Sequence, residues 1–234
     1  NGNESSWSKP ARFGVGLLDK NDWTASYIGY PSEKGFYSCP QLRKTFSLNK
    51  TDKKGAYLLH VNSLGYHEVF MNGKKVGEDV LSPAVSQFDK RSLIVTYDVT
   101  PFLRTGKNDL VIWLGSGWYT EGLPGVAGNG PVVRAQMEHV HKGTSETVLY
   151  TDASWVGRES EYSRISDWMT GRYGGETVSG NLETQHIVFE APDELKWGEI
   201  AIAEIPEHEV TPQTVEPNRI METIQPAKIE KLND

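Results

Sequence analysis

The residues with the clearest chemical use are aromatic side chains placed beside glycines. Trp118 and Tyr119 follow a Gly-Ser-Gly triplet, and Trp168 and Tyr173 lie in the polar, glycine-rich stretch 163–183. Aromatic rings stack on the apolar C–H faces of sugar rings, so these four residues are candidates for a carbohydrate platform. Ordinary core or loop packing explains the same rings equally well, and the sequence leaves both interpretations open.

Polar residues that could hold sugar hydroxyls accompany these aromatics. Arg134 and Arg172 could each donate paired hydrogen bonds, although surface salt bridges are a competing explanation. Asn129 belongs to the glycine-rich loop 120–131, and long loops that leave a rigid sheet are often functional. Glu176 follows two glycines that free the backbone beside it, so it could accept hydrogen bonds from a ligand or simply cap a turn.

Carboxylate pairs raise the question of catalysis, because hydrolysis of a glycosidic bond needs two carboxyl groups around that bond. The chain offers Glu159 with Glu161, Glu176 with Glu183, and also Asp167. Pairs of carboxylates at such spacings occur by chance in acidic proteins, where they are solvated surface charges. They therefore support only an alternative hypothesis, an independent enzyme that uses a pair such as Glu176 and Glu183.

Metal and cofactor motifs are sparse. His139 and His141 would share one face of a strand, a spacing that can suit a metal, but no third ligand is identifiable from the sequence. Cys39 is the only cysteine, which excludes an intrachain disulfide and a multi-cysteine zinc site. The chain has no P-loop, no dinucleotide-binding glycine fingerprint, no HExxH and no GxSxG.

Composition narrows the class of protein further. The 234 residues carry a net charge of −7, which disfavours a nucleic-acid partner because phosphate contacts need a basic surface. Hydrophobic residues make up 37%, and no run approaches the roughly 18 apolar residues of a membrane span. The first residues also lack the basic start and apolar run of a signal peptide. We therefore expect neither nucleic acid nor membrane as a partner.

The elements that must position these residues are β-strands. Apolar and polar residues alternate in Ala56–Asn62 and Tyr66–Asn72, and an apolar run fills Asp109–Gly115. Asn72-Gly73 is a strong turn signal because both residues tolerate positive φ. No stretch of about 12 residues shows a convincing helical period, so we predict an all-β sandwich. Further strands are expected at Gln41–Leu48, Val132–His141, Thr147–Thr151, near Trp155 and at Trp197–Ile205, and residues 163–183 are expected to form a loop with a short helix.

Two long segments also resemble a known family. They read SLGYHEVFMNGKKVGEDVLSPAVSQFDKR (63–91) and TYDVTPFLRTGKNDLVIWLGSGWY (96–119). Their Asn-Gly turn, the Leu-Ser-Pro, Tyr-Asp-Val and Gly-Lys-Asn triplets and the final Gly-Trp-Tyr are similar, in order, to the N-terminal β-sandwich region of bacterial α-L-rhamnosidases of glycoside hydrolase family 78. The flanks resemble the family too, so the similarity covers nearly the whole chain.

The resemblance implies a jelly-roll, galactose-binding-like β-sandwich that recognises or positions rhamnose-containing glycans. It implies a parent enzyme, periplasmic or secreted, that hydrolyses terminal α-L-rhamnosides in an (α/α)6 catalytic barrel further along the same polypeptide, so no catalytic residue is carried over. We expect residues 1–20 to end a preceding fibronectin-like domain or linker. Residues 21–205 would form the sandwich, and residues 206–234 a linker or the first strand of the next domain.

Two departures from the family pattern bear on ligand binding. The family's Tyr-Asp-Ala-Arg is Val178-Ser179-Gly180-Asn181 here, and its Pro-Gly-Trp is Pro83-Ala84-Val85. Some modules of this kind bind rhamnose through calcium, but these changes prevent any assignment of calcium ligands. The alternative function is therefore a scaffold module that packs on the catalytic barrel without sugar affinity.

Overall fold

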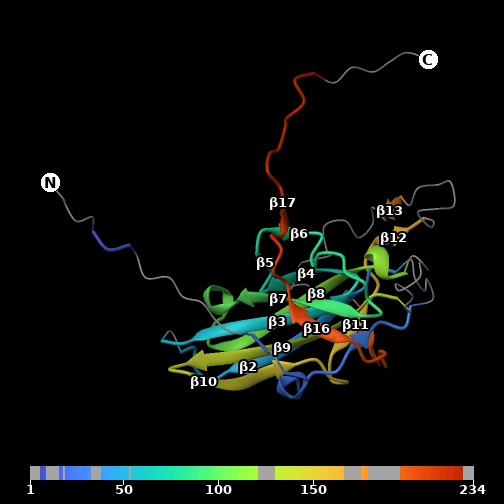
Figure 1. Ribbon diagram of the computed structural model, residues 1–234. Helices are drawn as coiled ribbons and strands as arrows, with labels where there is room; N and C mark the ends of the chain where they lie inside the picture. The colour runs from blue at the N-terminus through green and yellow to red at the C-terminus, as the bar shows by residue number, and fades with distance from the viewer. Residues whose placement is uncertain are drawn as a thin grey trace, which may run out of the picture.

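The computed structural model describes residues 6–8, 16–17, 19–32, 38–52, 54–120, 130–165, 175–178 and 196–228. Within these ranges the chain forms β-strands and three short 3-10 turns, η1 (Lys20–Asp22), η3 (Thr100–Phe102) and η4 (Gly117–Thr120). Two large sheets stack face to face (Figure 1). The predicted all-β sandwich is confirmed.

The first sheet has seven strands. Six of them follow the order β15-β1-β9-β3-β7-β16. The seventh, β10, pairs with β9, as β1 does. The strands are β1 (Ile28–Gly29), β3 (Ala56–Leu64), β7 (Arg91–Asp98), β9 (Val132–His141), β10 (Thr144–Tyr150), β15 (Ala201–Ile202) and β16 (Glu209–Pro212). Every pairing is antiparallel except that of β16 with β7, which is parallel and adds the C-terminal part of the chain to the sheet edge.

The second sheet has six strands in the order β14-β11-β2-β8-β4-β5. They are β2 (Gln41–Leu48), β4 (Tyr66–Met71), β5 (Lys74–Val76), β8 (Gly106–Gly115), β11 (Val156–Arg158) and β14 (Gly198–Glu199). Two further pairs lie outside the large sheets, β12 (Tyr162–Arg164) with β13 (Glu176–Val178), and β6 (Asp79–Val80) with β17 (Asn218–Arg219). In Figure 1 the β12–β13 pair lies to one side of the sandwich.

The core lies between the two sheets because alternate residues of each strand point to it. Leu59 and Val61 on β3 share one hydrophobic cluster with Ile112 and Leu114 on β8, and each is at most 1% exposed. Trp155, 1% exposed, belongs to the same cluster. Full burial of each aliphatic side chain stabilises the fold by about 1.5–3 kcal/mol, so this alternation is the main reason why the sequence forms a sandwich.

The outer face of the seven-stranded sheet carries buried polar side chains. Gln136 accepts hydrogen bonds from the backbone N–H of Thr24 (2.8 Å) and Ala25 (3.2 Å). Its Nε2 donates to the carbonyl of Asp22 (2.9 Å) and to Glu138 (2.8 Å). The segment before β1 is therefore fastened over this face by hydrogen bonds that satisfy the buried amide.

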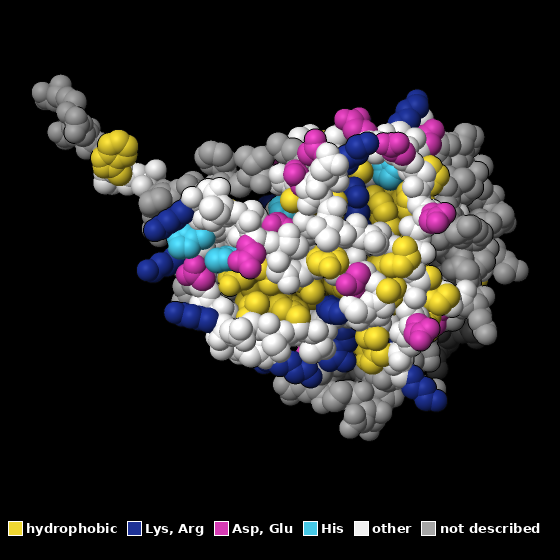
Figure 2. Space-filling model, turned by 90° about the horizontal axis from the view of Figure 1, so that it is seen from below, with side chains coloured by type: hydrophobic (Ala, Val, Ile, Leu, Met, Phe, Trp, Pro, Cys, Tyr) yellow, Lys and Arg dark blue, Asp and Glu magenta, His cyan; other side chains and the backbone are white. Residues whose placement is uncertain are grey.

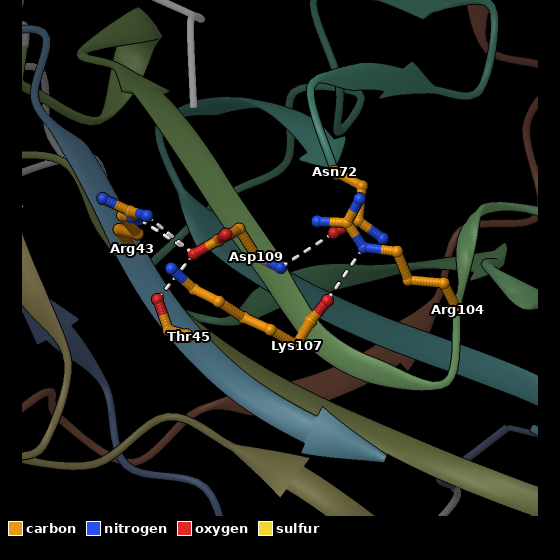
Figure 3. Close-up of polar contacts among 6 residues, drawn as sticks. All are labelled: Arg43, Thr45, Asn72, Arg104, Lys107 and Asp109. Carbon is orange, nitrogen blue, oxygen red and sulfur yellow. Dashed lines mark hydrogen bonds and ion pairs between the residues drawn. The ribbon is translucent and has the colours of Figure 1, made fainter. Parts of the chain in front are cut away.

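The outer face of the six-stranded sheet holds a buried ion pair (Figure 3). Arg43 on β2 lies 2.8 Å from Asp109 on β8, and the two side chains are 10% and 6% exposed. Burial alone would raise the pKa of Asp109, but hydrogen bonds from Thr45 and Arg43 outweigh it and lower that pKa. Asn72, in the turn after β4, accepts from the backbone N–H of Asp109 and so ties the turn to β8.

The long strands other than β7 were predicted, whereas short strands such as β1, β5, β6 and β16 were not. Gln41–Leu48 and Val132–His141 have the predicted bounds, and the Asn72-Gly73 turn has φ values of 51° and 78°. The expected strand Trp197–Ile205 is instead β14 and β15, which join different sheets, because the chain crosses between the sheets at Ile200. The described parts of 163–183 belong to β12 and β13 where a loop was expected, and the expected short helix is not tested because residues 166–174 and 179–183 lie outside the described residues. β7 was not predicted at all.

The surface has both signs of charge, as the composition of 24 basic and 31 acidic residues implies. On the face shown in Figure 2, Lys and Arg side chains are interspersed with Asp and Glu, and apolar side chains lie between them. Helices long and apolar enough to cross a membrane do not occur in the part of the chain that the structure describes.

Candidate functional site

A cavity of about 250 Å3 lies on the outer face of the six-stranded sheet, near the β12–β13 pair. We call it the Trp113 cavity. Trp113 on β8 lies directly opposite Glu68 on β4, and both belong to the set of alternate residues that face away from the core. The lining residues are Cys39, Tyr66, His67, Glu68, Leu81, Trp113, Leu114, Gly115, Tyr162 and Glu176.

Two aromatic rings form one side of this cavity. The rings of Trp113 and Tyr162 lie 5.2 Å apart between centroids at an angle of 59°. The indole Nε1 of Trp113 donates a hydrogen bond to the carbonyl of Cys39 at 3.0 Å. This bond fixes the orientation of the indole, so the half-buried ring is available as a rigid apolar surface.

Two carboxylates and one aliphatic side chain complete the cavity. Glu68 pairs with Lys75 at 2.6 Å, and Glu176 is exposed at the start of β13. Leu81 is 57% exposed and has a left-handed backbone with φ of 54°, which is unusual for a leucine. The cavity thus combines aromatic surface, acceptors for hydroxyl groups and an apolar contact, a composition compatible with a sugar ligand.

A chain of buried hydrogen bonds begins at the His67 position. His67 Nδ1 lies 2.7 Å from Ser63 Oγ, and Nε2 lies 3.0 Å from Tyr97 Oη. Tyr97 Oη donates in turn to Asp79 Oδ2 at 2.8 Å. Burial lowers the pKa of His67 to about 4, although the carboxylate of Asp79 acts in the opposite direction. The imidazole is therefore neutral near pH 7 and makes β4 a rigid support for the cavity.

The predicted aromatic residues differ in their placement. Trp118 in η4 is 38% exposed and shares a side-chain hydrogen bond with Tyr66, so it lies beside the Trp113 cavity. Tyr119 is only 5% exposed and packs edge-on against Phe88 at 5.4 Å in a second core cluster. The structure therefore does not place these two neighbours on one exposed wall.

The other predicted site residues do not all meet. Glu176 lines the Trp113 cavity, whereas Arg134 lies on β9 in the other sheet and lines a different cavity. Asn129, Trp168 and Tyr173 lie outside the described residues. Glu183, the proposed partner of Glu176, and the single candidate Asp167 also lie outside them. In the remaining pair, Glu159 is half-buried and Glu161 is buried, and neither lines the Trp113 cavity.

The two spaced histidines acquire a third neighbour in the fold. Asp52 Oδ2 lies 3.0 Å from His141 Nδ1 and 3.6 Å from His139 Nε2. His139 Nε2 also faces the backbone of Gly55, where an added Cβ would come within 2.4 Å of it. Among the described residues, no three His, Cys, Asp or Glu side chains are arranged to hold a metal.

Calcium, which the sequence resemblance raised, needs several oxygen ligands. In the Trp113 cavity the described carboxylates are Glu176 and Glu68, and Lys75 already neutralises Glu68. These two side chains do not fit a calcium site by themselves, because the ion takes six to eight oxygens.

Sequence reasoning missed most of the cavity's lining. Trp113 lies inside an apolar run that indicates a buried strand, and Tyr162 was not assigned to a strand. The alternation of inward and outward side chains along a strand is the signal that could have found the outward-facing residues of the lining. His67, Val69 and Met71 point inward, so Tyr66 and Glu68 must point outward.

Residues 54–222 match the model of the family described as alpha-L-rhamnosidase N-terminal domain. An alpha-L-rhamnosidase from Formosa agariphila is 30% identical over 227 residues, which cover 83% of this chain and 23% of that protein.

Solved structures agree with the sequence matches. The α-L-rhamnosidase from Dictyoglomus thermophilum has a TM-score of 0.73 at 25% identity, covering 92% of this chain and 25% of that one. The Streptomyces avermitilis α-L-rhamnosidase, determined with L-rhamnose, has a TM-score of 0.66 at 30% identity, covering 80% of this chain and 18% of that one. The chain thus spans a quarter or less of each of these relatives.

Proposed function

The chain belongs to the alpha-L-rhamnosidase N-terminal domain family, and we propose that it recognises or positions rhamnose-containing glycans for a larger enzyme. That parent enzyme would hydrolyse terminal α-L-rhamnosides in an (α/α)6 barrel of the same polypeptide, outside the cytoplasm. In this proposal residues 21–205, together with β16 (Glu209–Pro212) at the sheet edge, are the sugar-binding sandwich. Residues 1–20 belong to a preceding domain or linker, and the rest of residues 206–234 leads to the next domain.

The observation that carries the proposal is the composition of the Trp113 cavity. L-Rhamnose is a 6-deoxy sugar, so it presents a methyl group and an apolar ring face together with hydroxyl donors. Trp113 and Tyr162 offer an aromatic surface, Leu81 offers an apolar contact, and Glu68 and Glu176 offer acceptors. Hydrogen bonds to ionised acceptors are stronger than neutral ones, so the carboxylates would fix the orientation of the sugar.

Residues beside the cavity would extend the site to further sugar units. Trp118 is exposed next to Tyr66 and is the described candidate for such a contact. Asn129, Trp168 and Tyr173 stay predictions as sugar contacts. Tyr119 is better assigned to the core, because its ring packs against Phe88.

A second candidate function, positioning of the catalytic barrel without sugar affinity, has an observation of its own. Four apolar side chains between residues 215 and 224 are strongly exposed, and contiguous exposed apolar residues often mark interaction surfaces. They are Val215 (57%), Ile220 (71%), Met221 (91%) and Ile224 (80%). Another part of the same polypeptide is the proposed partner of this segment.

Calorimetric titration of the 234-residue chain with L-rhamnose, with and without calcium, tests the proposal. We expect binding that Glu176→Gln weakens by about tenfold, because a hydrogen bond to a charged acceptor contributes about 1.5–3 kcal/mol. Glu216→Gln, at an exposed position away from the cavity, is the matched control and should bind like the wild type. Absence of binding at millimolar sugar would favour the positioning function. Turnover of an aryl rhamnoside that Glu176→Gln abolishes would instead favour the independent enzyme.

A further inference from the structure

A second cavity, of about 600 Å3, lies over β9 of the seven-stranded sheet, on the side of the sandwich that the proposed rhamnose site does not use. We call it the Arg134 cavity. The segments before β1 and after β15 line it, and Arg134 projects from β9. The lining residues are Leu17, Asp19, Lys20, Asn21, Trp23, Tyr27, Arg134, Ile205, Pro206, Glu207, His208, Glu209 and Val210.

The guanidinium of Arg134 lies against two aromatic rings. Its central carbon lies 4.2 Å from the centroid of Trp23 and 4.9 Å from that of Tyr27. Tyr27 is itself fixed, because its hydroxyl donates to Asn62 on β3. The capping box of η1, formed by Asp19 and Asp22, defines the turn that directly precedes Trp23. The guanidinium is therefore preorganised rather than a flexible surface charge.

Arg134 has no carboxylate partner within the described residues. Its Nε is buried without a hydrogen-bond partner, and the side chain is only partly exposed. An unpaired charge of this kind is costly, because burial removes water without supplying an acceptor. The two rings contact the guanidinium without supplying oxygen acceptors for its N–H groups, and its planar fork matches two oxygens of an oxyanion.

The other charges of the cavity lie at its exposed rim. Lys20 pairs with Glu207 at 3.2 Å, and these side chains are 79% and 86% exposed. Asp19 and Glu209 are exposed as well. Exposed charges are screened by water and salt, so these rim carboxylates oppose an anion at Arg134 less than buried carboxylates would.

We propose that the Arg134 cavity binds the oxyanion of an acidic sugar, a carboxylate or a sulfate ester, as a second glycan subsite. The assignment of an oxyanion depends only on Arg134 and its surroundings. The choice of a glycan as the carrier of that oxyanion rests on the proposed function. Such a subsite would let the domain distinguish charged from neutral rhamnose-containing glycans.

Titration of the 234-residue chain with D-glucuronate, D-glucose and sodium sulfate at constant ionic strength tests the proposal. We expect glucuronate to bind at least about tenfold more tightly than glucose, and Arg134→Gln to abolish this difference. Sulfate that competes with glucuronate indicates a general oxyanion site, and failure to compete indicates a carboxylate site. Equal affinity for glucose and glucuronate, or glucuronate binding that Arg134→Gln leaves unchanged, overturns the proposal.

Two further variants keep the test decisive if Arg134→Gln does not fold. Glu207→Gln retains Arg134 and removes a rim carboxylate, so glucuronate should bind about twofold more tightly; weaker binding contradicts the proposal. Glu176→Gln, in the other cavity, should reduce rhamnose binding and leave glucuronate binding unchanged. If only rhamnose or only glucuronate fails to bind the wild-type chain, the result shows which of the two proposed sites is incorrect.

Discussion

The outer face of one sheet is covered by other parts of the chain, whereas the outer face of the other sheet borders an open cavity. On the seven-stranded sheet, Gln136 and Glu138 are buried beneath the chain's own backbone and fully engaged in hydrogen bonds. On the six-stranded sheet, Trp113 and Glu68 border an open cavity. Side chains alternate along the strands of both sheets, so each sheet has outward-facing residues. The two outer faces differ because the connecting segments cover one and leave the other open.

This contrast separates structural from ligand-binding polar groups. Glu138 accepts hydrogen bonds from Gln136, Ser145 and Thr147, so its oxygens have no role left for a ligand. Glu176 is exposed in a cavity with aromatic walls and keeps its acceptors available to hydroxyl groups. Arg134 is the exception on the covered sheet, because its guanidinium has neighbouring rings and its buried Nε has no acceptor among the described residues.

The largest effect is expected from breaking the buried ion pair of the six-stranded sheet. Asp109→Ala leaves Arg43 charged and buried, so the free energy of unfolding should fall by about 3–5 kcal/mol. Urea denaturation measures this change. Glu216→Ala removes the same charge at an exposed position and should change stability by less than about 0.5 kcal/mol. Similar small losses in both variants would show that this end of the sheet tolerates an unpaired arginine.

A comparable loss of stability is expected at acidic pH. His67 is neutral in the folded state with a pKa of about 4, against 6.5 for a free imidazole. The unfolded chain therefore binds more protons between these values, and stability falls as the pH drops from 6.5 to 4, by about 3 kcal/mol from this residue. His60, whose pKa burial also lowers, acts in the same direction. Urea denaturation as a function of pH should show a shallower dependence in His67→Gln, and an unchanged dependence would argue against a buried neutral His67.

A smaller loss is expected on the covered face. Gln136→Leu deprives the backbone N–H groups of Thr24 and Ala25 of their acceptor, which should cost about 1–3 kcal/mol. Thermal unfolding of this variant can be compared with Gln87→Leu, the same change at an exposed position. If both variants unfold alike, the hydrogen bonds of Gln136 do not fasten the segment before β1.

Local pattern predicted most of the long strands and the Asn72-Gly73 turn, but not the cavities. The bounds of β2 and β9 follow from alternation, and the Asn72-Gly73 turn follows from its tolerance of positive φ. β7 was missed because Leu93, Ile94 and Val95 are consecutive and hide the alternation.

The sites depend on contacts between distant residues. Trp113 and Tyr162 meet only because β12 lies against the face of the sheet that carries β8. The sequence singled out Arg134, but its aromatic neighbours Trp23 and Tyr27 precede it by more than 100 residues. Residue type alone therefore indicated which chemistry was available, whereas tertiary packing decided which residues share a cavity.

The seven indole N–H signals of the chain give the most direct test of the central claim, that the open face of the six-stranded sheet binds rhamnose. Trp113→Phe assigns the Trp113 signal in a two-dimensional nitrogen–proton NMR spectrum. Addition of L-rhamnose should shift that signal, whose N–H donates to Cys39, and leave the signal of the buried Trp155 unchanged. Rhamnose binding that shifts Trp23 and not Trp113, or no shift at saturating sugar, would contradict the account.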